Sequence, residues 1–87
     1  MRFWPWSFWL HRASIGAVDA RDVFAANLRS ERHRLGLSQE ALGQLSDLNM
    51  SEISRLERSR RDPRLATIVR LAGALWVPPA KLLDGIQ

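Results

Sequence analysis

The sequence predicts a single all-α domain of five helices, and three observations support this prediction. Apolar residues recur at three- and four-residue spacing along most of the chain beyond residue 19, which is the spacing of one face of a helix. No stretch shows the alternation of apolar and polar residues that is typical of a strand. The chain has 87 residues, 46% hydrophobic and 25% charged, which suffices for one domain with a modest core.

The first helix is expected over residues 20–35. Either Asp19 or Asp22 places negative charge near its N-terminus, where the helix dipole favours it. Gly36 then supplies the left-handed conformation that commonly ends a helix. The apolar residues that recur at helical spacing are Phe24, Leu28 and Leu35.

Two short helices joined by a tight turn are expected between Ser38 and Arg58. Ser38 is a favoured N-cap for the first of them, and either Asn49 or Ser51 can cap the second. Gly43 stands where the two helices must come closest. The residues expected on the inward faces are Leu42, Leu48, Ile53 and Leu56.

A fourth helix is expected to begin after Asp62, with Pro63 in its first turn, where proline is tolerated. Its end carries Trp76, a large aromatic residue whose position near the surface indicates an interface. Residues 80–83 are expected to add one last helical turn. The residues of the fourth helix expected to face the core are Leu65, Ile68, Val69, Ala72 and Leu75.

Residues 1–19 differ from the rest of the chain, because three of its four tryptophans lie there around Pro5. Several interpretations stay open for this Trp-rich arm. It could be a signal peptide, although Pro5 and the pair His11–Arg12 fit that poorly. It could also be an anchor at a membrane surface, a flexible arm or dimer-covering flap, or sequence upstream of the true start codon.

Composition excludes several functional classes. The chain has no cysteine, which excludes disulfides, zinc fingers and thiol chemistry, and its two histidines lack neighbouring ligands, so neither a metal nor a cofactor is expected. No nucleophile–base pair or phosphate-binding glycine loop is present, so neither an enzyme nor a small-molecule substrate is expected. No segment approaches the ~20 apolar residues of a membrane span, so a membrane partner is not expected. The net charge of +4 comes mainly from arginine, which suits phosphates and guanine edges.

The segments LSQEAL and ISRLERSRRDP, with a small residue and a hydrophobic turn residue between them, resemble the Cro/phage-repressor (Xre-type) helix-turn-helix family. The resemblance covers roughly residues 23–83. It implies a lambda-repressor-like DNA-binding domain over residues 20–87, to which the Trp-rich arm of residues 1–19 does not conform. It also implies a small bacterial transcriptional regulator that binds double-stranded DNA sequence-specifically, as a repressor or a restriction-modification controller-like protein. Its location would be cytoplasmic, at the nucleoid.

The resemblance implies that a helix over residues 50–58 enters the major groove. Arg55 is the strongest candidate for base recognition, because arginine pairs bidentately with guanine, whereas Asn49 could be only an N-cap. Gln39 and four arginines would hold phosphates. The four arginines in both subunits of a dimer would give a salt slope of about −7. The alternative for the arginine run is a solvated loop. The expected base contacts are Asn49, Met50, Ser51, Glu52 and Arg55, and the expected phosphate contacts are Gln39, Arg58, Arg60, Arg61 and Arg64.

Two further features follow from the resemblance. An ion pair between Arg32 and Glu57 would tie the first helix to the end of the recognition helix. Three positions depart from the family pattern: Ser46 replaces a core leucine, Asp47 a turn glycine that needs a positive φ, and Ser59 the glycine after the recognition helix.

Proteins of this type usually bind palindromic operators as homodimers, with half-sites ~34 Å apart. The expected dimer interface is formed by the C-terminal residues Leu75, Trp76, Val77, Leu82 and Leu83. The alternatives are an antitoxin component, or a protein-interaction or membrane-surface module that uses the Trp-rich arm.

Overall fold

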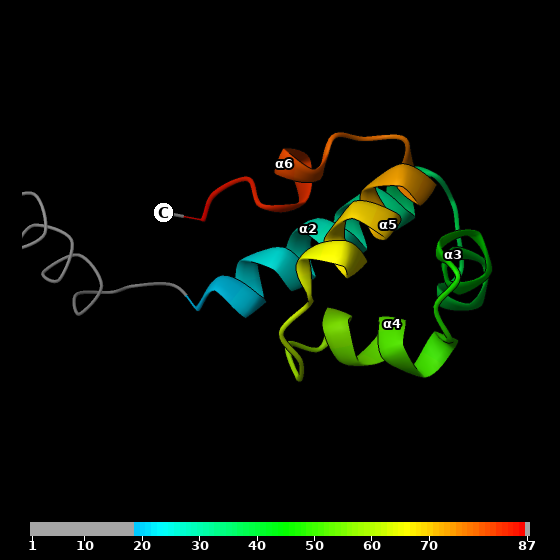
Figure 1. Cartoon of the computed structure of the whole chain (residues 1–87), viewed down its shortest axis with the longest axis horizontal. Helices are drawn as coiled ribbons and strands as arrows, with labels where there is room; N and C mark the ends of the chain where they lie inside the picture. Colours follow the sequence, from blue (N-terminus) through cyan, green and yellow to red (C-terminus); the bar gives the residue numbers. More distant parts are fainter. Residues whose placement is uncertain (1–18, 87) are drawn as a thin grey trace, which may run out of the picture.

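A computed structural model describes residues 19–86, and five helices make up most of this part of the chain (Figure 1). No strand occurs between residues 19 and 86, so the predicted all-α fold is confirmed there. The Trp-rich arm lies outside the described residues, except for Asp19. The helices are α2 (Ala20–Arg34), α3 (Gln39–Ser46), α4 (Met50–Glu57), α5 (Leu65–Leu75) and α6 (Pro79–Leu82).

Helix α2 has the expected caps at its two ends. The Asp19 carboxylate accepts a hydrogen bond from the backbone N–H of Arg21 at 2.9 Å, so Asp19 is the N-cap. Gly36 has a φ of 68° and turns the chain after the last helical residues. Phe24 is buried as predicted, but Leu35 follows the last turn and is 38% exposed, so its assignment to the inward face was wrong.

The turn between α3 and α4 depends on close contact of the backbone. A Cβ atom added to Gly43 would lie 2.6 Å from the carbonyl oxygen of Leu48, which confirms the need for the smallest residue there. Asp47 has the predicted positive φ, at 61°. Ser46 is buried, and its hydroxyl donates to the carbonyl oxygen of Leu42 at 2.7 Å, so a polar group is accommodated where an apolar one was expected.

Helix α5 differs from the predicted helix in the residue at which it begins and in the side that faces the core. It begins at Leu65 with Arg64 as N-cap, so Pro63 precedes the helix and does not belong to its first turn. Leu65 is 74% exposed and Val69 is 51% exposed, so their assignment to the core was wrong. The residues that α5 buries instead are Thr67, Ile68, Leu71, Ala72 and Leu75.

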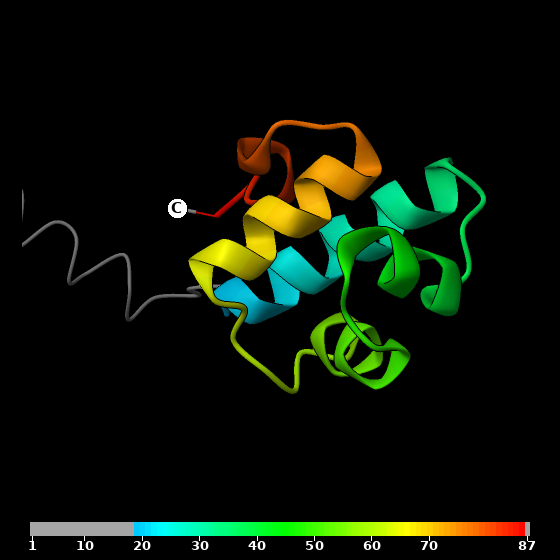
Figure 2. The same cartoon turned by 45° about the vertical axis from the view of Figure 1, so that its right-hand side comes forward.

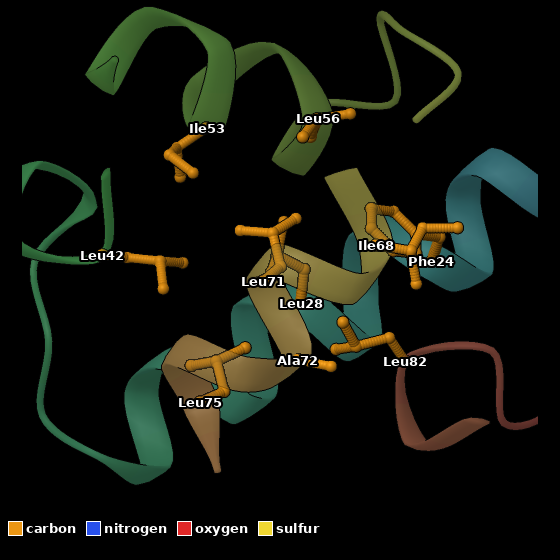
Figure 3. Packing of buried hydrophobic residues seen from close by; sticks show 10 residues of the cluster. All are labelled: Phe24, Leu28, Leu42, Ile53, Leu56, Ile68, Leu71, Ala72, Leu75 and Leu82. Atoms are coloured by element: carbon orange, nitrogen blue, oxygen red, sulfur yellow. The ribbon is translucent and has the colours of Figure 1, made fainter. Parts of the chain in front are cut away.

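Apolar side chains from all five helices form one core (Figure 3). Ile53 and Leu56 extend from α4 toward the side chains of α2 and α5, and both are fully buried. Burial of this kind stabilises by roughly 1.5–3 kcal/mol per large side chain. Leu75 and Leu82 are also 0% exposed, so these two leucines are core residues and their assignment to a dimer interface was wrong.

Asn27 fastens the C-terminal segment to α2. Its side-chain Nδ2 donates to the carbonyl oxygens of Leu82 and Asp84, each at 2.9 Å. These carbonyls follow or end α6 and would otherwise lack a partner within the helix. A polar residue therefore lies on the inward stripe of α2 because it holds the last helix in place.

Candidate nucleic-acid interface

Helix α4 lies at an edge of the molecule, on the opposite side from α6 in both views (Figures 1 and 2). Ile53 and Leu56 anchor its inner face in the core. The outer face is open: Met50 is 52% exposed, and Ser51 and Arg55 are exposed as well. A short helix with a buried apolar side and an open polar side can enter a groove without unfolding.

The N-terminus of α4 is capped by Asn49. Its Oδ1 accepts the backbone N–H of Glu52 at 2.7 Å and the hydroxyl of Ser51 at 2.9 Å. Capping satisfies one of the backbone donors that have no partner within the helix. Asn49 is therefore the cap, and Ser51 supports it from the first turn.

The C-terminal end of α4 is held by a buried ion pair with α2. Arg32 Nε lies 2.6 Å from Glu57 Oε2, and Arg32 Nη2 donates to Glu57 Oε1 at 2.8 Å. Both residues are less than a tenth exposed. Burial alone would raise the pKa of Glu57, but hydrogen bonds from Arg32 and Gln39 outweigh it and hold this pKa below its ordinary value. The hydrogen bonds between Arg32 and Glu57 also stabilise the charged form of Arg32 and raise its pKa above the ordinary value.

Two further side chains complete this attachment. Gln39 Nε2 donates to Glu57 Oε1 at 3.0 Å, which leaves the second N–H of its amide for the expected phosphate contact. Arg29 donates to the backbone carbonyl of Glu57. The role of Arg29 was not predicted, because the carbonyl that it contacts lies 28 residues away in the sequence.

The arginines that follow α4 are all exposed, and none of the four pairs with an acidic residue within residues 19–86. Asp62, which lies among them, is instead 3.5 Å from Arg21 Nε. Ser59 has a φ of 59°, and its hydroxyl donates to the carbonyl oxygen of Arg21 at 3.5 Å. Arg21, which the sequence did not single out, therefore holds the loop against the start of α2. The arginines left free for an anionic partner are Arg58, Arg60, Arg61 and Arg64.

A separate apolar face lies on the outside of α5. Leu65, Val69 and Gly73 follow one another at four-residue spacing, and Trp76 follows Gly73 by three residues. All four are exposed, Trp76 by 88%. Trp76 also has a φ of 62°, a left-handed conformation that is costly for a residue other than glycine, asparagine or aspartate. We call these four residues the α5 face.

Residues 19–86 contain no cluster of three or more acidic, histidine or cysteine side chains arranged for a metal ion. In the same part of the chain, no helix has the length and apolarity needed to cross a membrane. What the surface offers is an open helix face bordered by free guanidinium groups, an arrangement that suits base edges and phosphates.

Comparison with known proteins gives consistent matches. The profile of a family described as "Helix-turn-helix domain" matches residues 23–84. The control protein C.SmaI of Serratia marcescens is 39% identical over 71 residues, covering 82% of this chain and 84% of the relative. The solved structure of the restriction-modification controller protein C.AhdI of Aeromonas hydrophila has a TM-score of 0.70 and 40% identity, covering 71% of this chain and 94% of that one. The P22 c2 repressor in complex with a synthetic operator has a TM-score of 0.67 and 32% identity, with coverage of 71% and 94%.

Proposed function

The chain belongs to the helix-turn-helix family of DNA-binding transcriptional regulators, and we propose that it recognises a specific double-stranded sequence through the open face of α4. The observation that carries the proposal is the combination of this exposed, capped helix with the free arginines that follow it. The helix supplies groups for base edges, and the arginines supply positive charge for the flanking phosphates. Such a protein acts by binding, without an enzymatic step.

Arg55 has the central role in this proposal. It is exposed on the outer face of α4, and an arginine side chain there can pair bidentately with guanine O6 and N7. Gln39, the first residue of α3, donates one amide N–H to Glu57 and has the other available for a phosphate. The proposed base contacts are Asn49, Met50, Ser51, Glu52 and Arg55, and the proposed phosphate contacts are Gln39, Arg58, Arg60, Arg61 and Arg64.

The test is selection of duplexes from genomic fragments by the purified chain, followed by binding of the enriched duplex at several salt concentrations. Arg55→Ala should weaken preference at one base step by about 1–3 kcal/mol while the salt dependence falls only slightly. Lys81→Ala is the matched control, because it removes one positive charge from α6, on the opposite side of the molecule from α4. Binding that is weak, salt-driven and indifferent to sequence in the wild type would refute the proposal.

We further propose that two copies of the chain associate through the α5 face and together bind a palindromic operator. Two local features of this face weaken the isolated chain: Gly73 in the last turn of α5 and Trp76 in a left-handed conformation. Each costs roughly 1 kcal/mol relative to a better-suited residue. A glycine without a side chain beside an exposed tryptophan allows a second surface to approach the helix backbone closely. Such an interface would account for the presence of both costly residues.

The dimer interface is accordingly reassigned to exposed residues. Trp76 and Leu83 remain available, at 88% and 38% exposure, and Val77 is half-buried. Leu65 and Val69 join them from α5. Trp76→Gly should stabilise the isolated chain by up to about 1 kcal/mol and still weaken self-association. Sedimentation equilibrium measures association and urea unfolding measures stability; a variant that self-associates like the wild type would exclude this interface.

The identity of the relatives favours one class of regulated gene. The solved structure of C.AhdI, at 40% identity, is that of a restriction-modification controller protein, and the relative C.SmaI, at 39% identity, is a control protein. We propose a controller-like role, in which the operator precedes genes for DNA modification or cleavage. Mapping the selected genomic fragments tests this directly, and fragments that precede only unrelated genes would favour a plain repressor or an antitoxin component.

We assign DNA binding to residues 20–87, in the cytoplasm at the nucleoid, and treat residues 1–19 as an appended segment. Deletion of residues 1–18 is the informative truncation, because it retains Asp19, the N-cap of α2. DNA affinity should then equal that of the full chain. A loss of binding would show that the Trp-rich arm takes part in recognition. Unchanged binding would be consistent with an arm that contacts a protein or a membrane surface instead.

A further inference from the structure

The cap of α4 contains a hydrogen-bond arrangement that restricts how two proposed base contacts can act. Asn49 Oδ1 accepts from the backbone N–H of Glu52 at 2.7 Å and from Ser51 Oγ at 2.9 Å. Asn49 and Ser51 are both exposed at the start of the open face. The inference rests on the proposed function, because it concerns the bases that these side chains contact.

The direction of each hydrogen bond is fixed by chemistry. A backbone N–H can only donate, so the side-chain atom of Asn49 that faces Glu52 must be the carbonyl oxygen, and the amide NH2 points elsewhere. That oxygen carries no proton, so the hydroxyl of Ser51 must donate its single proton to it. Both lone pairs of Asn49 Oδ1 are thereby occupied, and the only proton of Ser51 is used.

We propose that this network makes Asn49 a pure hydrogen-bond donor and Ser51 a pure acceptor toward DNA. Asn49 keeps two N–H groups, which suit guanine O6 and N7, thymine O4 or a phosphate oxygen. Ser51 keeps only lone pairs, which suit the amino groups of cytosine N4 or adenine N6. The bidentate asparagine–adenine pair needs both a donor and an acceptor on the same side chain, so the intact cap excludes it at Asn49.

The same logic extends along the helix. Glu52 is half-buried and, as a carboxylate, can only accept, whereas Arg55 can only donate. The open face therefore presents donors at Asn49 and Arg55 and acceptors at Ser51 and Glu52. An operator half-site that fits this pattern offers acceptors to the first pair and amino groups to the second.

Substitution of Ser51 tests the inference, because it changes both residues at once. Ser51→Ala removes the acceptor toward DNA and also frees one lone pair of Asn49 Oδ1. Lys81→Ala, in α6 on the opposite side of the molecule from α4, serves as the control. The measurement is selection from randomised duplexes with the full chain, followed by binding to the enriched site with single base-pair changes.

Ser51→Ala should lose preference for an amino-bearing base at one position, on the order of tenfold, and should newly accept adenine at the base pair that Asn49 contacts. Lys81→Ala should keep the wild-type preferences at both positions. If the wild type enriches a site and Ser51→Ala shows the same preferences at every position, the proposed function stands and this inference is wrong. If the wild type itself enriches no sequence, the proposed function fails and the inference fails with it.

Discussion

Replacing Arg32 by methionine should strongly destabilise the fold while leaving the open face of α4 untouched. Methionine keeps an apolar stem of similar length but removes the guanidinium group that pairs with Glu57. The Glu57 carboxylate is 3% exposed, so it would be left buried with only Gln39 as a side-chain donor. Breaking a buried pair in this way costs about 3–5 kcal/mol.

That cost is large for a chain of this size. Typical stabilities of roughly 0.05–0.15 kcal/mol per residue correspond to about 4–13 kcal/mol for such a chain. Arg32→Met should therefore fold marginally, whereas the double variant Arg32→Met/Glu57→Met should recover most of the loss, because no unpaired charge remains. Urea unfolding followed by far-UV circular dichroism, at one fixed protein concentration, gives the three free energies.

The pH dependence provides a second, independent criterion. In the wild type, the folded pKa of Glu57 is lowered, so its contribution to stability is complete above the unfolded value of about 4.3 and is lost as the pH falls through the folded pKa. Without Arg32, burial dominates and raises that pKa, so the variant should gain stability on mild acidification. A cost below about 1 kcal/mol for Arg32→Met, with no recovery in the double variant, would show that the pair does not hold α4 to α2.

Substitutions at three further positions have defined expectations in urea unfolding. Gly43→Ala should destabilise by about 2 kcal/mol or more, because its Cβ would lie 2.6 Å from the carbonyl oxygen of Leu48; an effect below 0.5 kcal/mol would mean that the turn adjusts freely. Ser38→Ala should cost about 1 kcal/mol through loss of the cap to Ala41 N, and Ser38→Asp should restore it. Gly73→Ala should stabilise the isolated chain by about 0.5–1 kcal/mol and weaken self-association in sedimentation, whereas unchanged association would show that no backbone approaches there.

Local signals made much of the fold predictable. The caps at Asp19, Ser38 and Asn49 and the left-handed residues Gly36 and Asp47 are each determined by chemistry within a few residues along the chain. These signals mark where helices begin and end, and periodicity supplies the segments between them. The existence and order of the five helices followed from such local information.

The orientation of α5 was not predictable in the same way. Leu65 and Val69 fit helical spacing as well as Ile68 and Ala72 do, so apolar residues occupy more than half of the helix circumference. A pattern of this width does not specify which side faces the core. The choice depends on the surfaces of α3 and α6, against which α5 packs most closely, and the remaining apolar residues form the exposed α5 face.

The candidate site also contains residues that the sequence predicted and residues that it did not. The outer residues of α4 and the Arg32–Glu57 ion pair were identified from the motif, but the contacts of Gln39 and Arg29 with Glu57 were not. Gln39 meets Glu57 across 18 residues, and Arg29 meets the same residue's carbonyl across 28. Such pairings depend on the angles that α2 and α3 make with α4, which no spacing along the chain encodes.

The way in which α4 is fastened has a consequence for how new specificities can arise. It is attached by the buried side chains of Ile53 and Leu56, by the ion pair of Glu57 with Arg32 and by the backbone turn at Gly43. None of these uses the side chains of Met50 or Arg55. The outer positions can therefore be exchanged with little loss of folding, so a library randomised there should consist mainly of folded proteins. A gene duplicate of this chain could thus diverge toward a different operator through viable single substitutions.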